Sequence, residues 1–448
     1  MSSDTSSAKP LSGGLNFQLS TMMFLQYAIW GAWLPLLWPF LSGHREFSPS
    51  EIGNMFAIGA VGAIVAPFIA GQIADRWFNT EKFLGISHIL GGILVWQLAS
   101  LETYNSFLVF SLLYSLIYSP TLSLTNSLAF HHLPDRDRDF GKIRVWGTIG
   151  WIVVGIGIGQ WLLHQHTPTG VEAEAVSAAQ AAGMADAFKL SGLLGIVMGI
   201  FCFFLPSTPP AKEEKKSAIG GALDAIRLQP LLTLFLIAVP ISCVHQFYFV
   251  HTAPFLGQFQ NQAEGFIDIV NKIVGVGGGG LMTIGQMAEI GVLALIPLFA
   301  KKYSRKALLC VGIAAYALRM FLFAYSPGFP EAAQLPAIIL GIAMHGLCFG
   351  CFIFVAFMVV DEECAIDVRA SAQSLFNLVI VGIGIIVGSK VAGYVAEIST
   401  VNEVMNYQKL FSVPMWAALA CLVIMQLCYP NKPPATAADG PSDKDADL

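Results

Sequence analysis

Long apolar segments dominate the chain, and short polar connections separate them. Of its 448 residues, 55% are hydrophobic and 12% are charged, whereas a soluble globular domain carries about 25% charged residues. A bilayer core is roughly 30 Å thick, so each crossing helix needs about 20 apolar residues, and this chain accommodates about twelve crossings. The predicted crossing segments are 17–41, 52–73, 83–101, 105–130, 143–163, 187–206, 230–256, 275–299, 306–326, 335–360, 370–396 and 409–428. We predict an all-α integral membrane protein.

The apolar segments form two sets of six, divided by the polar stretch 207–229. This stretch contains Pro209, Pro210 and the charged run 212–216, a composition typical of a linker. The last residues are rich in Ala, Asp and Pro, which favours disorder. The predicted domains are an N-terminal six-helix bundle at 1–206, a cytoplasmic linker at 207–229, a C-terminal six-helix bundle at 230–428 and a disordered cytoplasmic tail at 429–448.

The positive charges give these segments an orientation. If both termini lie in the cytoplasm, most Lys and Arg residues fall on the cytoplasmic side, as the positive-inside rule requires. Miscounting one helix would scramble this pattern, so the charges support about twelve crossings. The net charge is only −5, and the Lys and Arg residues are not gathered on one face. Nucleic-acid binding therefore has no support.

Two connections resemble each other. The stretch 71–77 follows the second segment, and the basic stretch 301–306 follows the eighth. Matching connections of this kind favour a transporter built from duplicated six-helix halves. Within the first stretch, Gly71, Asp75 and Arg76 are predicted to have a gating or structural role.

Polar residues within the N-terminal spans mark a candidate site, because such residues are costly in lipid. Arg144, Thr148 and Trp151 share one face of segment 143–163 through i, i+4, i+7 spacing. The alternative for Arg144 is a side chain that snorkels to the headgroups. Gln26 and Trp30 share a face of the first segment, where aromatic rings either stack on a planar ligand or pack helices together.

The C-terminal spans carry titratable groups. Gln286 and Glu289 share a helix face, and Glu289 lies mid-span, where a buried carboxylate can exchange protons near neutral pH. The alternative is a structural pair with Arg319, which falls near mid-membrane. His345, with Phe349 one turn later, can relay protons or serve as a hydrogen-bonded packing residue.

Other patterns in the sequence give little evidence for a functional site. Gln246 adds a polar group to segment 230–256. Cys348 and Cys351 match C-x-x-C inside an apolar span, where packing is the simpler interpretation. The run 277–280 lacks the Lys of a phosphate loop. The sequence shows no nucleophile–base set and no metal-ligand set, so we predict a protein that is not an enzyme and needs no cofactor.

Six stretches resemble the major facilitator superfamily and, within it, the nucleoside:proton symporter family of bacterial nucleoside and xanthosine permeases. The stretch 71–77 resembles the superfamily's motif between helices 2 and 3. The more specific stretches are 25–33, 119–126, 143–150, 318–325 and 369–373. The resemblance covers nearly the whole chain and implies the major facilitator fold with twelve transmembrane helices.

The resemblance also implies a function. It implies a proton-coupled nucleoside importer of the cell inner membrane, a monomer that works by alternating access and takes its energy from the proton gradient. The implied partners are a nucleoside, protons and the lipid bilayer. The implied ligand lies between the halves. Its implied lining residues are Arg144, Thr148, Trp151, Gln246, Gln286, Glu289, His345 and Phe349, to which spacing adds Gln26 and Trp30. Glu289 and His345 are the expected proton-coupling residues, and Arg319 a structural one.

Two positions depart from the nucleoside permeases. Phe249 stands where they carry an Asn, and Gly350 stands where they carry an acidic residue. The first change makes the expected pocket more apolar, and the second leaves Glu289, with His345, as the main candidate for the proton. Two alternatives stay open: a transporter of the same fold for another polar solute, such as a sugar or a purine derivative, and a non-transporting membrane sensor.

Overall fold

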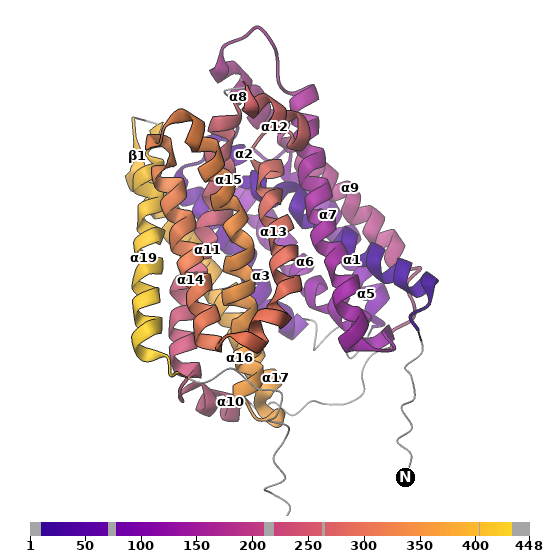
Figure 1. The fold of residues 1–448 in the computed structure, drawn as a ribbon. Helices are drawn as coiled ribbons and strands as arrows, with labels where there is room; N and C mark the ends of the chain where they lie inside the picture. Colours follow the sequence, from indigo (N-terminus) through magenta and orange to yellow (C-terminus); the bar gives the residue numbers. More distant parts are fainter. Residues whose placement is uncertain (1–9, 70–77, 210–218, 262–264, 403, 432–448) are drawn as a thin grey trace, which may run out of the picture. The chain divides into compact units, whose positions relative to one another are not determined.

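The computed structural model describes residues 10–69, 78–209, 219–261, 265–402 and 404–431. Helices make up nearly all of the described chain (Figure 1). The predicted motif residues Gly71, Asp75 and Arg76 lie outside the described residues, as do the middle of the predicted linker and the predicted tail from residue 432 onward.

The contacts between residues divide the chain into two compact units. Unit 1 comprises Met1–Lys215, Gln246–Thr283 and Val381–Met405, and unit 2 comprises Lys216–His245, Ile284–Ile380 and Asn406–Leu448. Some helices therefore contribute to both units. The division of the chain into bundles at 1–206 and 230–428, joined by a linker, stays a prediction.

Unit 1 contains the first helices of the chain and parts of later ones. Its first elements are α1 (Gly13–Trp33), η1 (Leu34–Leu36), α2 (Leu37–Gly43), α3 (Pro49–Ile69), α5 (Thr80–Leu98), α6 (Tyr104–His132), α7 (Arg136–Gln165), α8 (Ala173–Gly183) and α9 (Ala185–Cys202). Its later elements are the second part of α11 (Leu231–Gln260), α12 (Phe266–Val274), the start of α13 (Gly279–Lys302), α18 (Ile385–Ser399), and the antiparallel strands β1 (Thr400–Val401) and β2 (Val404–Met405).

Unit 2 contains the remaining helices. They are α10 (Ile219–Ile226), the first part of α11, most of α13, α14 (Arg305–Tyr325), η3 (Ser326–Gly328), α15 (Glu331–Leu347), η4 (Cys348–Phe354), α16 (Val355–Glu363), α17 (Ile366–Asn377), the start of η5 (Leu378–Gly384) and α19 (Tyr407–Cys428). Both η4 and η5 are π-helical segments inside longer helices. Helix α14 packs against α19 and α15 in this unit (Figure 1).

Eleven helical segments of the described residues are long and apolar enough to cross a membrane. Helix α5 fills the position of the remaining predicted span, 83–101, with 19 residues. It is less apolar because it carries Glu81, Lys82, His88 and Gln97. Its length fits a crossing helix, since about 20 residues span the bilayer core.

Small residues hold α5 against α9. A Cβ built on Gly92 would come within 2.7 Å of the backbone oxygen of Gly192, and one on Gly195 within 2.9 Å of the Cα of Gly92. Glycine at these positions therefore lets the two backbones touch, as is common where membrane helices cross.

The short helix α12 lies against the end of α7 in unit 1. The Nε2 of Gln160 donates to the backbone oxygen of Lys272 at 3.0 Å. Three apolar side chains of α12, Phe266, Ile269 and Ile273, are 58%, 52% and 65% exposed. At spacing i, i+3, i+7 they share one face, so α12 is an amphipathic helix with an open apolar side.

Candidate functional site

Helix α1 carries a buried glutamine whose side chain connects three helices of unit 1. The Nε2 of Gln26 donates to Oγ1 of Thr121 at 2.9 Å, and its Oε1 lies 2.9 Å from Nε2 of His88. An amide oxygen only accepts hydrogen bonds, so Nε2 of His88 donates here. The hydroxyl of Tyr118 donates to the backbone oxygen of Gln26. Gln26 is fully buried, so it ties α1 to α5 and α6, and its contact with a substrate stays a prediction.

Four aromatic rings of unit 1 follow one another across α6, α1, α7 and α11; we term Tyr118, Trp30, Trp151 and Phe249 the aromatic row. The ring centroids of Tyr118 and Trp30 are 6.4 Å apart, and those of Trp30 and Trp151 are 5.8 Å apart. The next pair, Trp151 and Phe249, is 6.4 Å apart at 77°. Such edge-to-face contacts are favourable for aromatic pairs. The structure therefore brings together Trp30 and Trp151, which were predicted separately on two helices.

Arg144 contacts a ring on α1. Its Cζ atom lies 4.0 Å from the ring centre of Tyr27, which is a cation–π distance. Gly147 makes room for this contact, because a Cβ there would come within 2.5 Å of Tyr27 and 2.9 Å of the Arg144 guanidinium. Arg144 and Thr148 are both half-buried on α7. A ring face does not occupy the in-plane N–H donors of a guanidinium, so Arg144 can still donate hydrogen bonds.

Gln246 is the first residue of α11 that belongs to unit 1. It is buried, at 5% exposure, and Phe249 of the aromatic row follows on the same face three residues later. Further along, Nε2 of His251 donates to the backbone oxygen of Ala392 at 3.1 Å. His251 is therefore a hydrogen-bonded packing residue, while the role of Gln246 stays a prediction.

Five polar side chains from four helices meet in unit 2; we term His245, Glu289, Tyr316, Arg319 and His345 the polar cluster. The Nε2 of His345 lies 3.5 Å from Oε2 of Glu289, and the Nη1 of Arg319 lies 3.4 Å from Nδ1 of His345. The Tyr316 hydroxyl lies 2.7 Å from Nδ1 of His245, whose ring stacks on that of His345 at 5.6 Å. A carboxylate and a guanidinium therefore contact the two nitrogens of one imidazole.

Close backbone contact between α13 and α15 positions this cluster. A Cβ built on Gly346 would come within 2.5 Å of the backbone oxygen of Ala288. Gly346 follows His345 in the chain, and Ala288 precedes Glu289. Glycine at this crossing therefore lets the carboxylate and the imidazole approach each other.

Three further residues of unit 2 bear on the predicted site. The ring centroid of Phe349, in η4, lies 6.4 Å from that of His345. The buried Oε1 of Gln286 accepts no hydrogen bond from the described part of the chain. A Cβ on Gly350 would come within 2.7 Å of the Val292 side chain. A larger residue at Gly350 would therefore displace Val292, which explains why glycine suits this packing.

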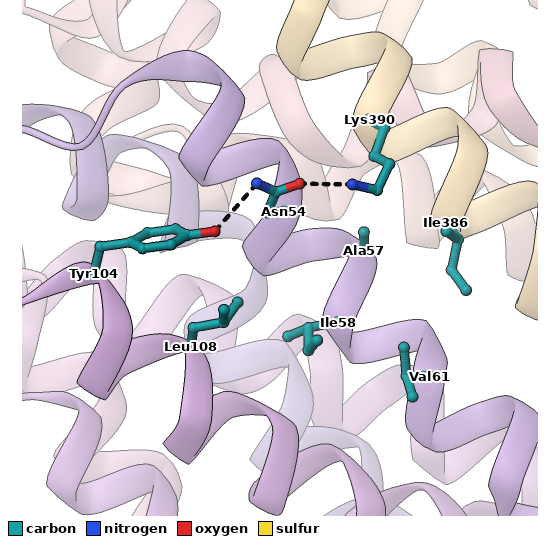
Figure 2. A pocket seen from close by; sticks show the side chains of 8 residues that line it. All are labelled: Asn54, Ala57, Ile58, Val61, Tyr104, Leu108, Ile386 and Lys390. Atoms are coloured by element: carbon teal, nitrogen blue, oxygen red, sulfur yellow. Dashed lines mark hydrogen bonds between the residues drawn. The ribbon is translucent and has the colours of Figure 1, made fainter.

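Unit 1 also has a small cavity of about 280 Å³ between α3, α6 and α18, shown in Figure 2. The Nζ of Lys390 donates to Oδ1 of Asn54 at 2.9 Å, and Nδ2 of Asn54 donates to the hydroxyl of Tyr104 at 3.1 Å. The other residues that line the cavity are apolar: Ala57, Ile58, Val61, Leu108 and Ile386. The predicted site residues do not line this cavity.

His88 and Tyr316 contribute to these clusters, although spacing along the sequence does not single them out. Both are polar residues inside apolar helices, and that property is the signal that could have found them, because buried polar groups in membranes need partners. Their partners, Gln26 and His245, lie on other helices. Spacing along one helix cannot reveal such contacts.

The sequence profile described as Nucleoside H+ symporter matches residues 14–433. The transporter YegT of Escherichia coli K12 is 33% identical over 85% of this chain and 84% of its own length. The xanthosine permease of the same strain is 28% identical over 91% and 94%, respectively.

Solved structures of transporters match the fold of this chain. The crystal structure of nucleoside transporter NupG matches with a TM-score of 0.78 and 25% identity, covering 93% of this chain and 100% of NupG. The D-xylose-proton symporter matches with a TM-score of 0.64 at 14% identity, over 94% and 100% of the two chains. The latter likeness concerns the fold alone. The predicted all-helical facilitator fold is confirmed.

Proposed function

Because this chain belongs to the nucleoside H+ symporter family, we propose that it carries a nucleoside into the cell together with a proton by alternating access. It is a multi-pass membrane protein of a transporter family and not an enzyme. The observation that carries the proposal is the family match over residues 14–433, which leaves only the ends of the chain unmatched. The relatives of this chain include a xanthosine permease and a nucleoside transporter of known structure.

The chemistry of unit 1 supports a nucleoside as the substrate. The aromatic row offers Trp30 and Trp151, both half-buried, as surfaces on which a planar base can stack. Arg144 and Thr148 lie on the helix that carries Trp151 and can donate hydrogen bonds to ribose hydroxyls or base edges. The amide of Gln246 is a further donor and acceptor.

The chemistry of unit 2 supports proton coupling. Glu289 is a carboxylate within the candidate span Gly279–Lys302, and such residues mark proton relays in transporters. His345 contacts it directly. Gln286 and Phe349 contribute an amide and a ring on the same helices, and we assign them to substrate contact.

Uptake into proteoliposomes tests this proposal. Labelled uridine and adenosine are offered with and without an outside-acid gradient of one pH unit. That gradient stores about 1.4 kcal/mol per proton, which supports about tenfold accumulation if one proton accompanies each nucleoside. We expect accumulation that a protonophore abolishes.

Three results would contradict parts of the proposal. If no nucleoside is taken up, and none raises the thermal unfolding midpoint of the protein, the proposed substrate class is wrong. If uptake occurs but ignores the gradient, transport stands and symport fails. If D-xylose accumulates and nucleosides do not, the chain transports another polar solute.

We also propose that both termini face the cytoplasm and that the protein resides in the inner membrane as a monomer. The distribution of Lys and Arg supports the orientation. The basic residues Lys301, Lys302 and Arg305 at the α13–α14 connection belong to the cytoplasmic side in this arrangement.

A further inference from the structure

We propose that Glu289 carries the transported proton and that His345 is a positioning residue which Arg319 keeps unprotonated. This inference rests on the proposed symport and divides the roles of the two candidate proton-coupling residues. It follows from the directions in which the hydrogen bonds of the polar cluster can run.

The hydrogen-bonding capacity of each group fixes the tautomer of His345. A guanidinium has five N–H donors and no acceptor. Nδ1 of His345, 3.4 Å from Nη1 of Arg319, must therefore offer its lone pair to that contact. A neutral imidazole with a bare Nδ1 carries its hydrogen on Nε2. Nε2 is the nitrogen that faces Oε2 of Glu289 at 3.5 Å, so the imidazole donates towards the carboxylate.

Adding a proton to His345 would break this arrangement. The new hydrogen would have to sit on Nδ1, where it would face an N–H of Arg319 instead of a lone pair. Two positive charges would then lie side by side in a buried site, since His345 is 2% exposed and Arg319 is fully buried. Like charges disfavour the charged form of a titratable group.

Protonation of Glu289 has no such obstacle. The side chain of Glu289 is 14% exposed, against 2% for that of His345, so the carboxylate is the more accessible of the two groups. A protonated carboxyl keeps an acceptor oxygen. The Nε2–H of His345 can therefore keep facing the carboxyl group at 3.5 Å while the proton is carried, which favours one orientation of that group.

Other titratable groups surround this pair and must be tested with it. His245 from α11 stacks on His345, and its Nδ1 contacts the Tyr316 hydroxyl of α14. A hydroxyl can donate or accept, so a protonated His245 would keep that partner. Cys348 from the start of η4 also contacts Arg319. His245 is therefore the alternative proton carrier.

Substitutions by amides separate these roles, because an amide can accept from Arg319 and donate to Glu289 but does not titrate. We expect His345→Gln or His345→Asn to transport more slowly, because the carboxylate is less well positioned, but still to accumulate nucleoside in a gradient, with the pH of half-maximal transport moved by less than about half a unit. The matched change His245→Gln should likewise retain accumulation. We expect Glu289→Gln to lose accumulation but to keep exchange of labelled for unlabelled nucleoside.

Counterflow without a gradient verifies that each variant is folded and binds substrate. The assignment is overturned if both His345 amide variants exchange nucleoside but no longer accumulate it. It is also overturned if Glu289→Gln still concentrates substrate, or if His245→Gln alone abolishes coupling.

A second measurement does not depend on transport. In protein with ¹⁵N-labelled histidine, the signal lost in His345→Gln identifies His345. We expect it to report a neutral ring with hydrogen on Nε2 from about pH 5.5 to 8, the range in which a free histidine titrates. Protonation of Nδ1 in that range would refute the assignment even if no nucleoside is transported. Failure of uptake with the expected ¹⁵N signal would instead reject the proposed function alone.

Discussion

At the scale of single residues, Phe249 of the aromatic row stands where the resemblance to the nucleoside permeases predicts an Asn. Its ring and that of Trp151 meet edge to face in unit 1. An Asn at this position would exchange that ring contact for an amide that can pair with a polar base edge. In the proposed nucleoside transport, we therefore expect Phe249 to affect which nucleoside is accepted.

We expect Phe249→Asn to alter substrate preference. A nucleobase that stacks on the Phe249 ring would form an aromatic pair worth about 0.5–1.5 kcal/mol beyond the area that it buries. Loss of that pair corresponds to roughly two- to tenfold weaker binding of nucleosides that depend on stacking. Competition by a panel of nucleosides against labelled uridine measures the change. Phe259→Leu, on the same helix but outside the aromatic row, should leave the order of preference unchanged; an unchanged order in Phe249→Asn would refute the role of Phe249.

Gln26 gives a prediction about stability. Gln26→Leu removes the acceptor of the buried His88 Nε2–H and one of the hydrogen bonds of Thr121, whose hydroxyl still donates to the backbone oxygen of Tyr118. An unsatisfied buried group costs about 1–3 kcal/mol. We expect a lower thermal unfolding midpoint in detergent. Gln97→Leu, on an exposed position of α5, is the control. Equal midpoints for the two variants would show that the network around Gln26 contributes little.

The sequence allowed part of these residue contacts to be predicted. Spacing placed Arg144, Thr148 and Trp151 on one helix face, because all three lie within one helix. It could not show that His345 lies between Glu289 and Arg319, since that depends on the crossing of α13, α14 and α15. The pairing of Glu289 with Arg319, which the sequence offers as an alternative, leaves out the imidazole that contacts both groups.

At the scale of helices, apolar length predicted the spans because the bilayer imposes that length. Three helices of the described residues lie outside the predicted segments: α8, α10 and α12, with 11, 8 and 9 residues. Each is too short to cross a membrane. The π-helical segments η4 and η5 could not be predicted either, because a locally wider helical turn leaves no mark in an apolar run. Such segments are frequent at functional sites, and η4 holds Phe349.

The crossing of α5 and α9 gives a prediction at this scale. Gly92→Val would place a branched side chain where a Cβ already meets the backbone of Gly192 at 2.7 Å. Overpacking of this kind costs about 1–3 kcal/mol, so we expect a lower unfolding midpoint and poorer expression. The control is Gly59→Ala, since a Cβ on Gly59 meets nothing within 4 Å. If Gly92→Val unfolds at the same temperature as the control, the helices are not held together by this close contact.

At the scale of the whole molecule, the charges of the connections predict the topology. We expect a fluorescent protein fused after Leu448 to fluoresce inside the cell, and a periplasmic phosphatase fused at the same place to be inactive. Fusions placed after Gly170, in the connection between α7 and α8, should give the reverse pattern. The same pattern from both sites would contradict the predicted orientation.

The open face of α12 has a consequence for the surroundings of the transporter. A short amphipathic helix with exposed Phe266, Ile269 and Ile273 suits the boundary between headgroups and acyl chains. Because the hydrogen bond from Gln160 attaches it to α7, lateral pressure in that layer would act on a helix that also carries Trp151 and Arg144. We therefore expect the transport rate to depend on headgroup size and acyl packing, even at a fixed proton gradient.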